Sequence, residues 1–142
     1  MSTSAVRTLG RRPDAAAAAR RHAREVVRPR DEQLAHDVEL VVSELVTNAV
    51  LHGSGRIILT LRLLRGGVRV GVADLGPGEP RRLEVSPGGR HGRGLFLVEA
   101  VAADWGVERL SDGGKEVWCL VSTDAAEQPS LSDAAVTQVI FR

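Results

Sequence analysis

Apolar residues recur with a helical period in two segments of the N-terminal half. After Asp14 the chain reads AAAAARRHAREVV and then meets Pro29, and a second periodic segment runs from Asp31 to His52, where Gly53 follows. Aspartate is a favoured residue before a helix, whereas proline and glycine are typical after its end. The pattern therefore predicts two helices, the second of about 21 residues.

Strand-forming residues dominate four shorter segments. Residues 56–64 (RIILTLRLL) and 68–74 (VRVGVAD) flank Arg65-Gly66-Gly67, and residues 105–110 (WGVERL) and 115–121 (KEVWCLV) flank a turn at 111–114. Alternating β-branched residues around glycine-containing connections predict two antiparallel hairpins.

The chain between these hairpins has a different composition. Residues 75–91 contain three prolines and four glycines, and residues 94–103 (GLFLVEAVAA) are apolar throughout. A connection of this length is either functional or disordered. The apolar stretch that follows predicts a buried helix.

This order of elements predicts an α+β fold, a two-layer sandwich of a mixed, mostly antiparallel sheet with helices on one face. The 142 residues suit one domain. We expect a flexible N-terminal tail over residues 1–12, the folded domain over 13–121, and a C-terminal tail over 122–142 that could serve as a docking segment.

Composition narrows the function classes. No apolar stretch reaches the length of a membrane span, and the N-terminus lacks the apolar block of a secretory signal, so a soluble, cytoplasmic protein is expected. The net charge is +1 and only four large aromatic rings are present, which argues against nucleic acid as a direct partner. The single cysteine, Cys119, is expected to fill the core within a strand.

Three polar residues lie four apart in the apolar run VVSELVTNAVLHG of the second predicted helix. Glu44 and Asn48 form a narrow stripe with apolar residues on both sides. They are either surface positions at the edge of an amphipathic helix or groups used in chemistry, because a buried carboxylate must be paired or used. His52 fits an ordinary histidine at the end of a helix.

Two further segments could bind a ligand. Asp74 shares a strand face with valines, where its carboxylate could accept a hydrogen bond from a purine amine, although DLGPG also fits a simple turn. Gly92-Arg93-Gly94 precedes the predicted helix, and backbone amides at such a junction bind phosphate, although glycines also simply end loops. Neither the GxGxxG fingerprint nor the GxxxxGK[ST] loop is present.

The order of these three motifs resembles that of the GHKL ATPases, the superfamily of gyrase, histidine kinase and MutL ATP-binding domains. Residues 44–48 (ELVTN) look like its helix-borne Asn box, residues 74–78 (DLGPG) like its DxGxG box, and residues 92–95 (GRGL) like its second glycine box. The wording SELVTNAVLHG resembles the anti-sigma-factor serine/threonine kinases and their actinobacterial relatives. The resemblance implies a Bergerat-type ATP-binding fold.

It also implies ATP and Mg²⁺ as cofactors. By resemblance Asn48 would hold Mg²⁺, Asp74 would accept the adenine amine, and Glu44 would be the general base. The remaining nucleotide contacts would come from the two glycine motifs, at Gly76, Gly78, Gly92, Arg93 and Gly94.

The implied function is an anti-sigma factor serine/threonine-protein kinase that transfers the γ-phosphate of ATP to a STAS-type anti-anti-sigma partner. Relatives in this branch often dimerise, so the resemblance also implies a homodimer. The alternative is a non-catalytic, nucleotide-gated module that sequesters a sigma factor or another regulator. A third reading, a member that binds no nucleotide, follows from Glu116, which stands where relatives carry threonine. A glutamate near Asp74 would add like charge, so it either turns outward or weakens nucleotide affinity.

Overall fold

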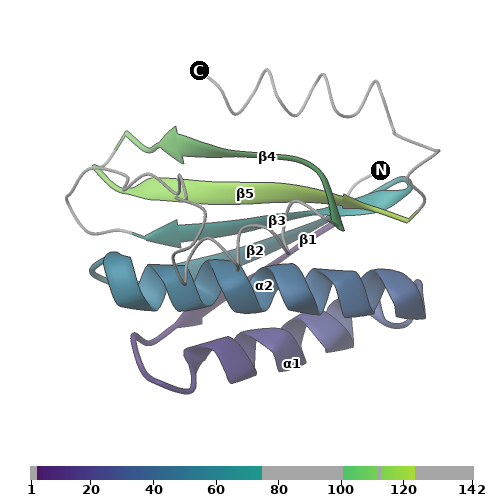
Figure 1. Ribbon diagram of the computed structural model, residues 1–142, viewed down its shortest axis with the longest axis horizontal. Helices are drawn as coiled ribbons and strands as arrows, with labels where there is room; N and C mark the ends of the chain where they lie inside the picture. The colour runs from purple at the N-terminus through teal and green to yellow at the C-terminus, as the bar shows by residue number, and fades with distance from the viewer. Residues whose placement is uncertain (1–2, 75–100, 112, 124–142) are drawn as a thin grey trace, which may run out of the picture.

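The computed structural model describes residues 3–74, 101–111 and 113–123. Its elements follow in the order β1 (Thr3–Leu9), α1 (Ala15–Val27), α2 (Glu32–His52), β2 (Ile57–Leu64), β3 (Gly67–Asp74), β4 (Ala102–Arg109) and β5 (Lys115–Ser122). Both helices lie side by side on the same face of the sheet, α1 against β1 and β2, and α2 against β2, β3 and β5 (Figure 1). The predicted two-layer α+β sandwich is confirmed.

The five strands form one sheet in the order β1-β2-β3-β5-β4, and each neighbouring pair is antiparallel. Gly66 (φ 79°) lies between β2 and β3, and Gly113 (φ 98°) lies between β4 and β5. A positive φ is easily adopted by glycine alone among the common residues. Both predicted hairpins are therefore present.

The prediction for the N-terminal segment is wrong, because Thr3–Leu9 forms β1 and pairs along its length with β2. The residues of this edge strand are mostly exposed, and only Leu9 is buried. Pairing at an edge depends on backbone hydrogen bonds, which leave no alternation of apolar and polar residues in the sequence. Residues 3–9 are part of the sheet and not a tail.

The helix predicted over residues 94–103 is wrong at its end, because β4 already begins at Ala102, which pairs with Val121 of β5. Short apolar runs cannot be assigned to helix or strand by periodicity. Residues 94–100 of that prediction lie outside the described residues.

The two predicted helices begin and end where the sequence indicated. The Asp31 side chain accepts a hydrogen bond from the Leu34 backbone N–H at 2.8 Å, as expected of a cap at the start of α2. Asp14 precedes α1 but makes no such side-chain hydrogen bond.

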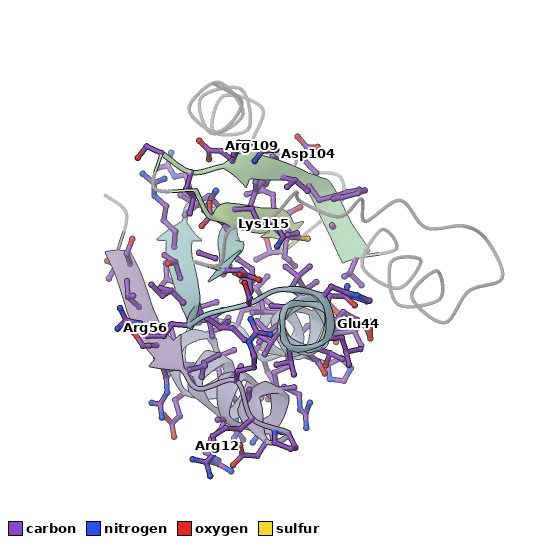
Figure 2. All side chains as sticks on the ribbon, turned by 90° about the vertical axis from the view of Figure 1, so that its left-hand side faces the viewer. Arg12, Glu44, Arg56, Asp104, Arg109 and Lys115 are labelled. Atoms are coloured by element: carbon purple, nitrogen blue, oxygen red, sulfur yellow. The ribbon has the colours of Figure 1, made fainter. Side chains whose placement is uncertain are left out.

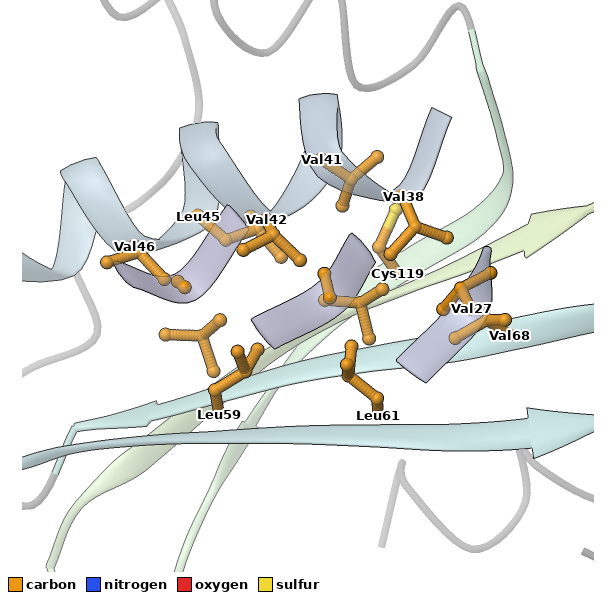
Figure 3. Close-up of a cluster of buried hydrophobic side chains, with 14 of the residues drawn as sticks. Val27, Val38, Val41, Val42, Leu45, Val46, Leu59, Leu61, Val68 and Cys119 are labelled. Atoms are coloured by element: carbon orange, nitrogen blue, oxygen red, sulfur yellow. The ribbon is translucent and has the colours of Figure 1, made fainter. Parts of the chain in front are cut away.

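The core lies between the helices and the sheet. Figure 3 shows valines and Leu45 of α2 facing Leu59 and Leu61 of β2 and Val68 of β3. Cys119 of β5 is buried in the same cluster, and this burial raises the pKa of its thiol to about 12. Cys119 is therefore neutral core filler at ordinary pH, as predicted.

Candidate functional site

Asp74 is a buried carboxylate at the last position of β3, with only 2% of the residue exposed. The backbone N–H of Ser54, just after α2, donates to its Oδ1 at 3.0 Å and to its Oδ2 at 3.1 Å. Val68, Val70 and Asp74 share the helix-facing side of the strand, as alternation predicted. The contact fixes the carboxylate beside the end of α2.

Two cations lie against this carboxylate. Lys115 Nζ is 3.4 Å from Asp74 Oδ2, and Arg11 Nη2 is 3.7 Å from the same oxygen. Lys115 reaches it because β5 pairs with β3 so that Lys115 stands directly opposite Asp74. A buried carboxylate without such partners would carry a large desolvation cost. Within the part of the chain that the structure describes, the Ser54 amide and two positive charges therefore hold Asp74.

Arg11 also joins this carboxylate to the end of α2. Its Nη1 donates to the carbonyl oxygens of Ala49 at 2.6 Å and Val50 at 2.7 Å, and its Nε donates to that of Gly55 at 3.3 Å. The Ala49 carbonyl also accepts the Gly53 backbone N–H at 2.9 Å. Carbonyls at the end of a helix carry partial negative charge, which a guanidinium compensates. Arg11 was not among the predicted site residues, because residues 1–12 were predicted to be a tail.

Position 53 requires glycine because the Asp74 carboxylate lies too close to leave room for a side chain. A Cβ atom at this position would lie 1.3 Å from Asp74 Oδ2. The φ of Gly53 is −98°, so its backbone conformation is open to any residue and space alone demands glycine. The sequence indicated a glycine stop here, but not the carboxylate that uses the room.

Asn48 and Glu44 lie one turn apart on α2. Asn48 is 8% exposed, and its side-chain Nδ2 is buried without a hydrogen-bond partner among the residues the structure describes. Glu44 is half-buried on a flank of α2, and Figure 2 shows Lys115 on the sheet above the same helix. Within the described ranges Glu44 makes no hydrogen bond or ion pair.

A buried amide without partners is costly, and a ligand is one way to satisfy it. The Asn48 amide carries an oxygen acceptor suited to Mg²⁺ and an N–H donor suited to a phosphate oxygen. The donor set therefore fits a Mg²⁺–nucleotide pair. Among the described residues there is no group of three or more histidines, cysteines or acidic residues that could hold a metal by itself.

The other expected contacts cannot be placed. Gly76, Gly78, Gly92, Arg93 and Gly94 lie outside the described residues, and so does the segment 75–91. His52 is exposed at the last position of α2 and has no assigned task.

Glu116 turns away from Asp74. Alternation along β5 places it on the sheet face opposite the helices, where its Oε1 accepts a hydrogen bond from Arg69 Nη2 at 2.8 Å. The Arg69 guanidinium carbon lies 5.7 Å from the centre of the Trp118 ring, a cation–π geometry. Of the two alternatives for Glu116, the outward one is correct, and Asp74 is spared the like charge.

The family model described as histidine kinase-like ATPase domain matches residues 9–120. No curated protein matches the chain. No helix within the described ranges has the length and apolarity to cross a membrane.

Solved structures that are similar to this chain include the following two. The crystal structure of the RsbU and RsbW domains of Rv1364c from Mycobacterium tuberculosis matches with a TM-score of 0.62 and 24% identity, over 84% of this chain and 32% of that chain. The histidine kinase domain from the Erythrobacter litoralis EL346 blue-light activated histidine kinase matches with a TM-score of 0.48 and 29% identity, over 69% of this chain and 48% of that chain. This chain thus spans less than half the length of either, and the first match shows a shared fold.

Proposed function

Because the chain belongs to the histidine kinase-like ATPase domain family, we propose that it binds ATP with Mg²⁺ and phosphorylates a serine or threonine of a regulatory protein. The observation that carries the proposal is the buried amide nitrogen of Asn48, which has no hydrogen-bond partner among the described residues, one helical turn after the unengaged carboxylate of Glu44. Residues four apart on a helix share one face, with roughly 5–6 Å between their Cβ atoms. A metal ligand and a base could therefore flank one phosphoryl group.

Three side chains divide the work. The Asn48 amide oxygen would hold Mg²⁺, and Asp74, fixed by the Ser54 N–H, would accept the exocyclic amine of adenine and so orient the nucleotide. Glu44 would accept the proton of the attacking hydroxyl. Bound Mg²⁺–ATP supplies the phosphoryl group and offsets its negative charge.

The transfer balances without any further reactant. The hydroxyl oxygen of the partner forms a bond to the γ-phosphorus, the bond from that phosphorus to the bridging oxygen breaks, ADP leaves, and the hydroxyl proton passes to Glu44. Half-burial keeps Glu44 accessible to a protein substrate, whereas full burial would exclude one.

The partners are proposed from the resemblance of SELVTNAVLHG to the anti-sigma-factor kinases. They are a sigma factor and a STAS-type anti-anti-sigma protein that carries the phosphorylated residue. Gly76, Gly78, Gly92, Arg93 and Gly94 remain proposed contacts to the nucleotide.

Nucleotide binding is tested by titrating the protein with ATP in the presence of Mg²⁺. We expect Asn48→Ala to weaken binding by at least about tenfold, since a metal contact is lost. Thr47→Ala is the matched control, because Thr47 is the exposed neighbour on the same helix. Thermal unfolding verifies that both variants are folded, and equal ATP affinity in the two variants would contradict the role given to Asn48.

Phosphoryl transfer is tested with labelled ATP and a purified STAS-type protein. We expect Glu44→Ala to lower the transfer rate by roughly a hundredfold or more while ATP affinity stays near that of the wild type. Full transfer by Glu44→Ala would remove Glu44 from the mechanism.

A second candidate is a nucleotide-gated binding module without kinase activity. It is favoured by the asymmetry between Asp74 and Asn48, which are both buried, and Glu44, which is only half-buried. A pure binder needs the first two but no base. Saturable ATP binding without transfer to any STAS-type protein would select this candidate.

A further inference from the structure

Lys115 is the only lysine of the chain. It lies beside Asp74, whose carboxylate is proposed to accept a hydrogen bond from the adenine amine. Its side chain is 14% exposed and that of Asp74 is 3% exposed, so both charged groups are largely removed from water. An ammonium group is costly to bury, and one that is buried needs a partner or a use. Asp74 is the partner that the geometry shows.

The Asp74 contact leaves donors of Lys115 unused. An ammonium group has three N–H donors, and Asp74 is the one hydrogen-bond partner of the Lys115 ammonium within the ranges that the structure describes. Arg11 already supplies a second positive charge 3.7 Å from the same carboxylate oxygen. Balancing the negative charge of Asp74 therefore does not by itself explain why a lysine lies at position 115.

Lys115 and Asp74 are also farther apart than the two members of a tight ion pair. Charge-assisted N–H···O bonds typically measure about 2.7–2.9 Å, whereas Lys115 Nζ is 3.4 Å from Asp74 Oδ2. The Asp74 carboxylate is held by the Ser54 N–H at 3.0 Å and not mainly by the lysine. A ligand group can therefore join the two side chains without breaking a tight ion pair.

The two side chains present an acceptor next to a donor. Adenine offers the complementary order on one edge, with its exocyclic amine as donor and the adjacent ring nitrogen N1 as acceptor. We propose that Lys115 is a specificity-determining residue, whose ammonium donates to N1 of adenine while Asp74 accepts the neighbouring amine. This inference rests on the proposed function, because it assigns a second base contact within the same nucleotide site.

The experiment compares ATP with 1-deaza-ATP, in which a C–H group replaces N1 and cannot accept a hydrogen bond. Both are titrated with Mg²⁺ into the full chain. We expect the wild type to bind ATP roughly tenfold more tightly than 1-deaza-ATP, as loss of a hydrogen bond to a charged donor predicts. In Lys115→Met this ratio should fall to about one.

Glu116→Gln is the matched control, because Glu116 follows Lys115 in β5 but points to the opposite face of the sheet. It should keep the wild-type ratio. Lys115→Arg retains a charged donor and should keep a ratio above one. If Lys115→Met does not fold, the wild type and Lys115→Arg still decide, since a wild-type ratio near one overturns the proposal without any variant.

Two further outcomes would overturn it. An unchanged ratio in folded Lys115→Met would show that another group recognises N1. Tighter ATP binding by Lys115→Met than by the wild type would show that the lysine competes with the base for Asp74. Absence of saturable ATP binding to the wild type is a separate result, and it would overturn the proposed function itself.

Discussion

Strands β3 and β5 are joined by two partly buried ion pairs, one on each face of the sheet. Away from the helices, Arg69 and Glu116 meet at 2.8 Å, and the guanidinium lies over Trp118. On the helix side, Asp74 and Lys115 meet at 3.4 Å. The first pair is at hydrogen-bond distance, although Arg69 Nε is buried without a hydrogen-bond partner, whereas the second pair is longer and lies beside the proposed nucleotide site.

A glycine makes room for each carboxylate. A Cβ at Gly71 would lie 2.3 Å from Glu116 Oε2, and a Cβ at Gly53 would lie 1.3 Å from Asp74 Oδ2. Glu116 has a longer side chain that can move away, but Asp74 is short and is fixed by the Ser54 N–H. The two faces therefore differ in rigidity as well as in the closeness of the ion pair.

The largest expected effect comes from breaking the ion pair between Arg69 and Glu116. Arg69→Met leaves the carboxylate of Glu116 without its partner, and we expect the free energy of unfolding to fall by about 3 kcal/mol, measured by urea denaturation. ATP affinity should not change, because the pair faces away from Asp74.

The double variant Arg69→Met with Glu116→Leu is the control, since replacing both charges by apolar groups removes the unpaired charge. It should recover most of the lost stability. A single-variant loss below about 1 kcal/mol would show that Glu116 finds other compensation.

The next effect separates the two glycines. Gly53→Ala forces the Asp74 carboxylate out of place, and we expect a loss of about 2 kcal/mol in stability together with weaker ATP binding. Gly71→Ala is the matched change on the other face, with an expected loss of about 1 kcal/mol and unaltered ATP affinity. Equal effects of the two variants on ATP affinity would end the functional distinction between the faces.

A smaller effect is expected at Arg11, which adds a third member to the Asp74 cluster. Arg11→Met removes two hydrogen bonds to carbonyls at the end of α2, and we expect a loss of about 1 kcal/mol in thermal or urea unfolding. Arg12→Met is the control, because the Arg12 side chain is 73% exposed and is paired with exposed Asp14. A surface pair of this kind contributes little, so equal losses would contradict the role of Arg11.

The smallest expected effect concerns Cys119 in the core between the helices and the sheet. Burial there raises the pKa of its thiol from 9.0 to about 12. Because the folded pKa is raised, the unfolded chain ionises first. The contribution of the neutral Cys119 thiol to the free energy of unfolding is fully present below pH 9.0. It is lost as the pH rises toward the pKa of the thiol in the folded protein.

At pH 9.5 this linkage should cost about 0.8 kcal/mol relative to pH 7. The cost is measured as the difference between the wild type and Cys119→Ala in urea unfolding at the two pH values. An equal pH dependence of the two proteins would show that Cys119 contacts water in the folded state.

Much of the fold could be predicted from local patterns. The period of the valines and leucines in α2 and the cap at Asp31 determine where that helix begins and which face it buries. Alternation in β3 places Asp74 on the helix side. These predictions succeeded because periodicity reports backbone geometry and burial, and both are local properties. The sequence left the orientation of Glu116 open between two alternatives.

The closest partners of Asp74 could not be predicted in this way. Ser54, Arg11 and Lys115 are separated from it by between 20 and 63 residues, and no pattern in the sequence connects them. Arg11 was hidden further, because an exposed edge strand such as β1 carries no alternation.

The sequence by itself determined the two helices, the two hairpins, the face of β3 on which Asp74 stands, and the motifs that resemble an ATP site. Only the tertiary structure decided that Glu116 forms an ion pair with Arg69. It also decided that Asp74 contacts Ser54, Arg11 and Lys115. The physical reason is that hydrogen bonds and ion pairs act within about 4 Å. Strand pairing and helix packing, which bring distant segments to that range, depend on the whole chain.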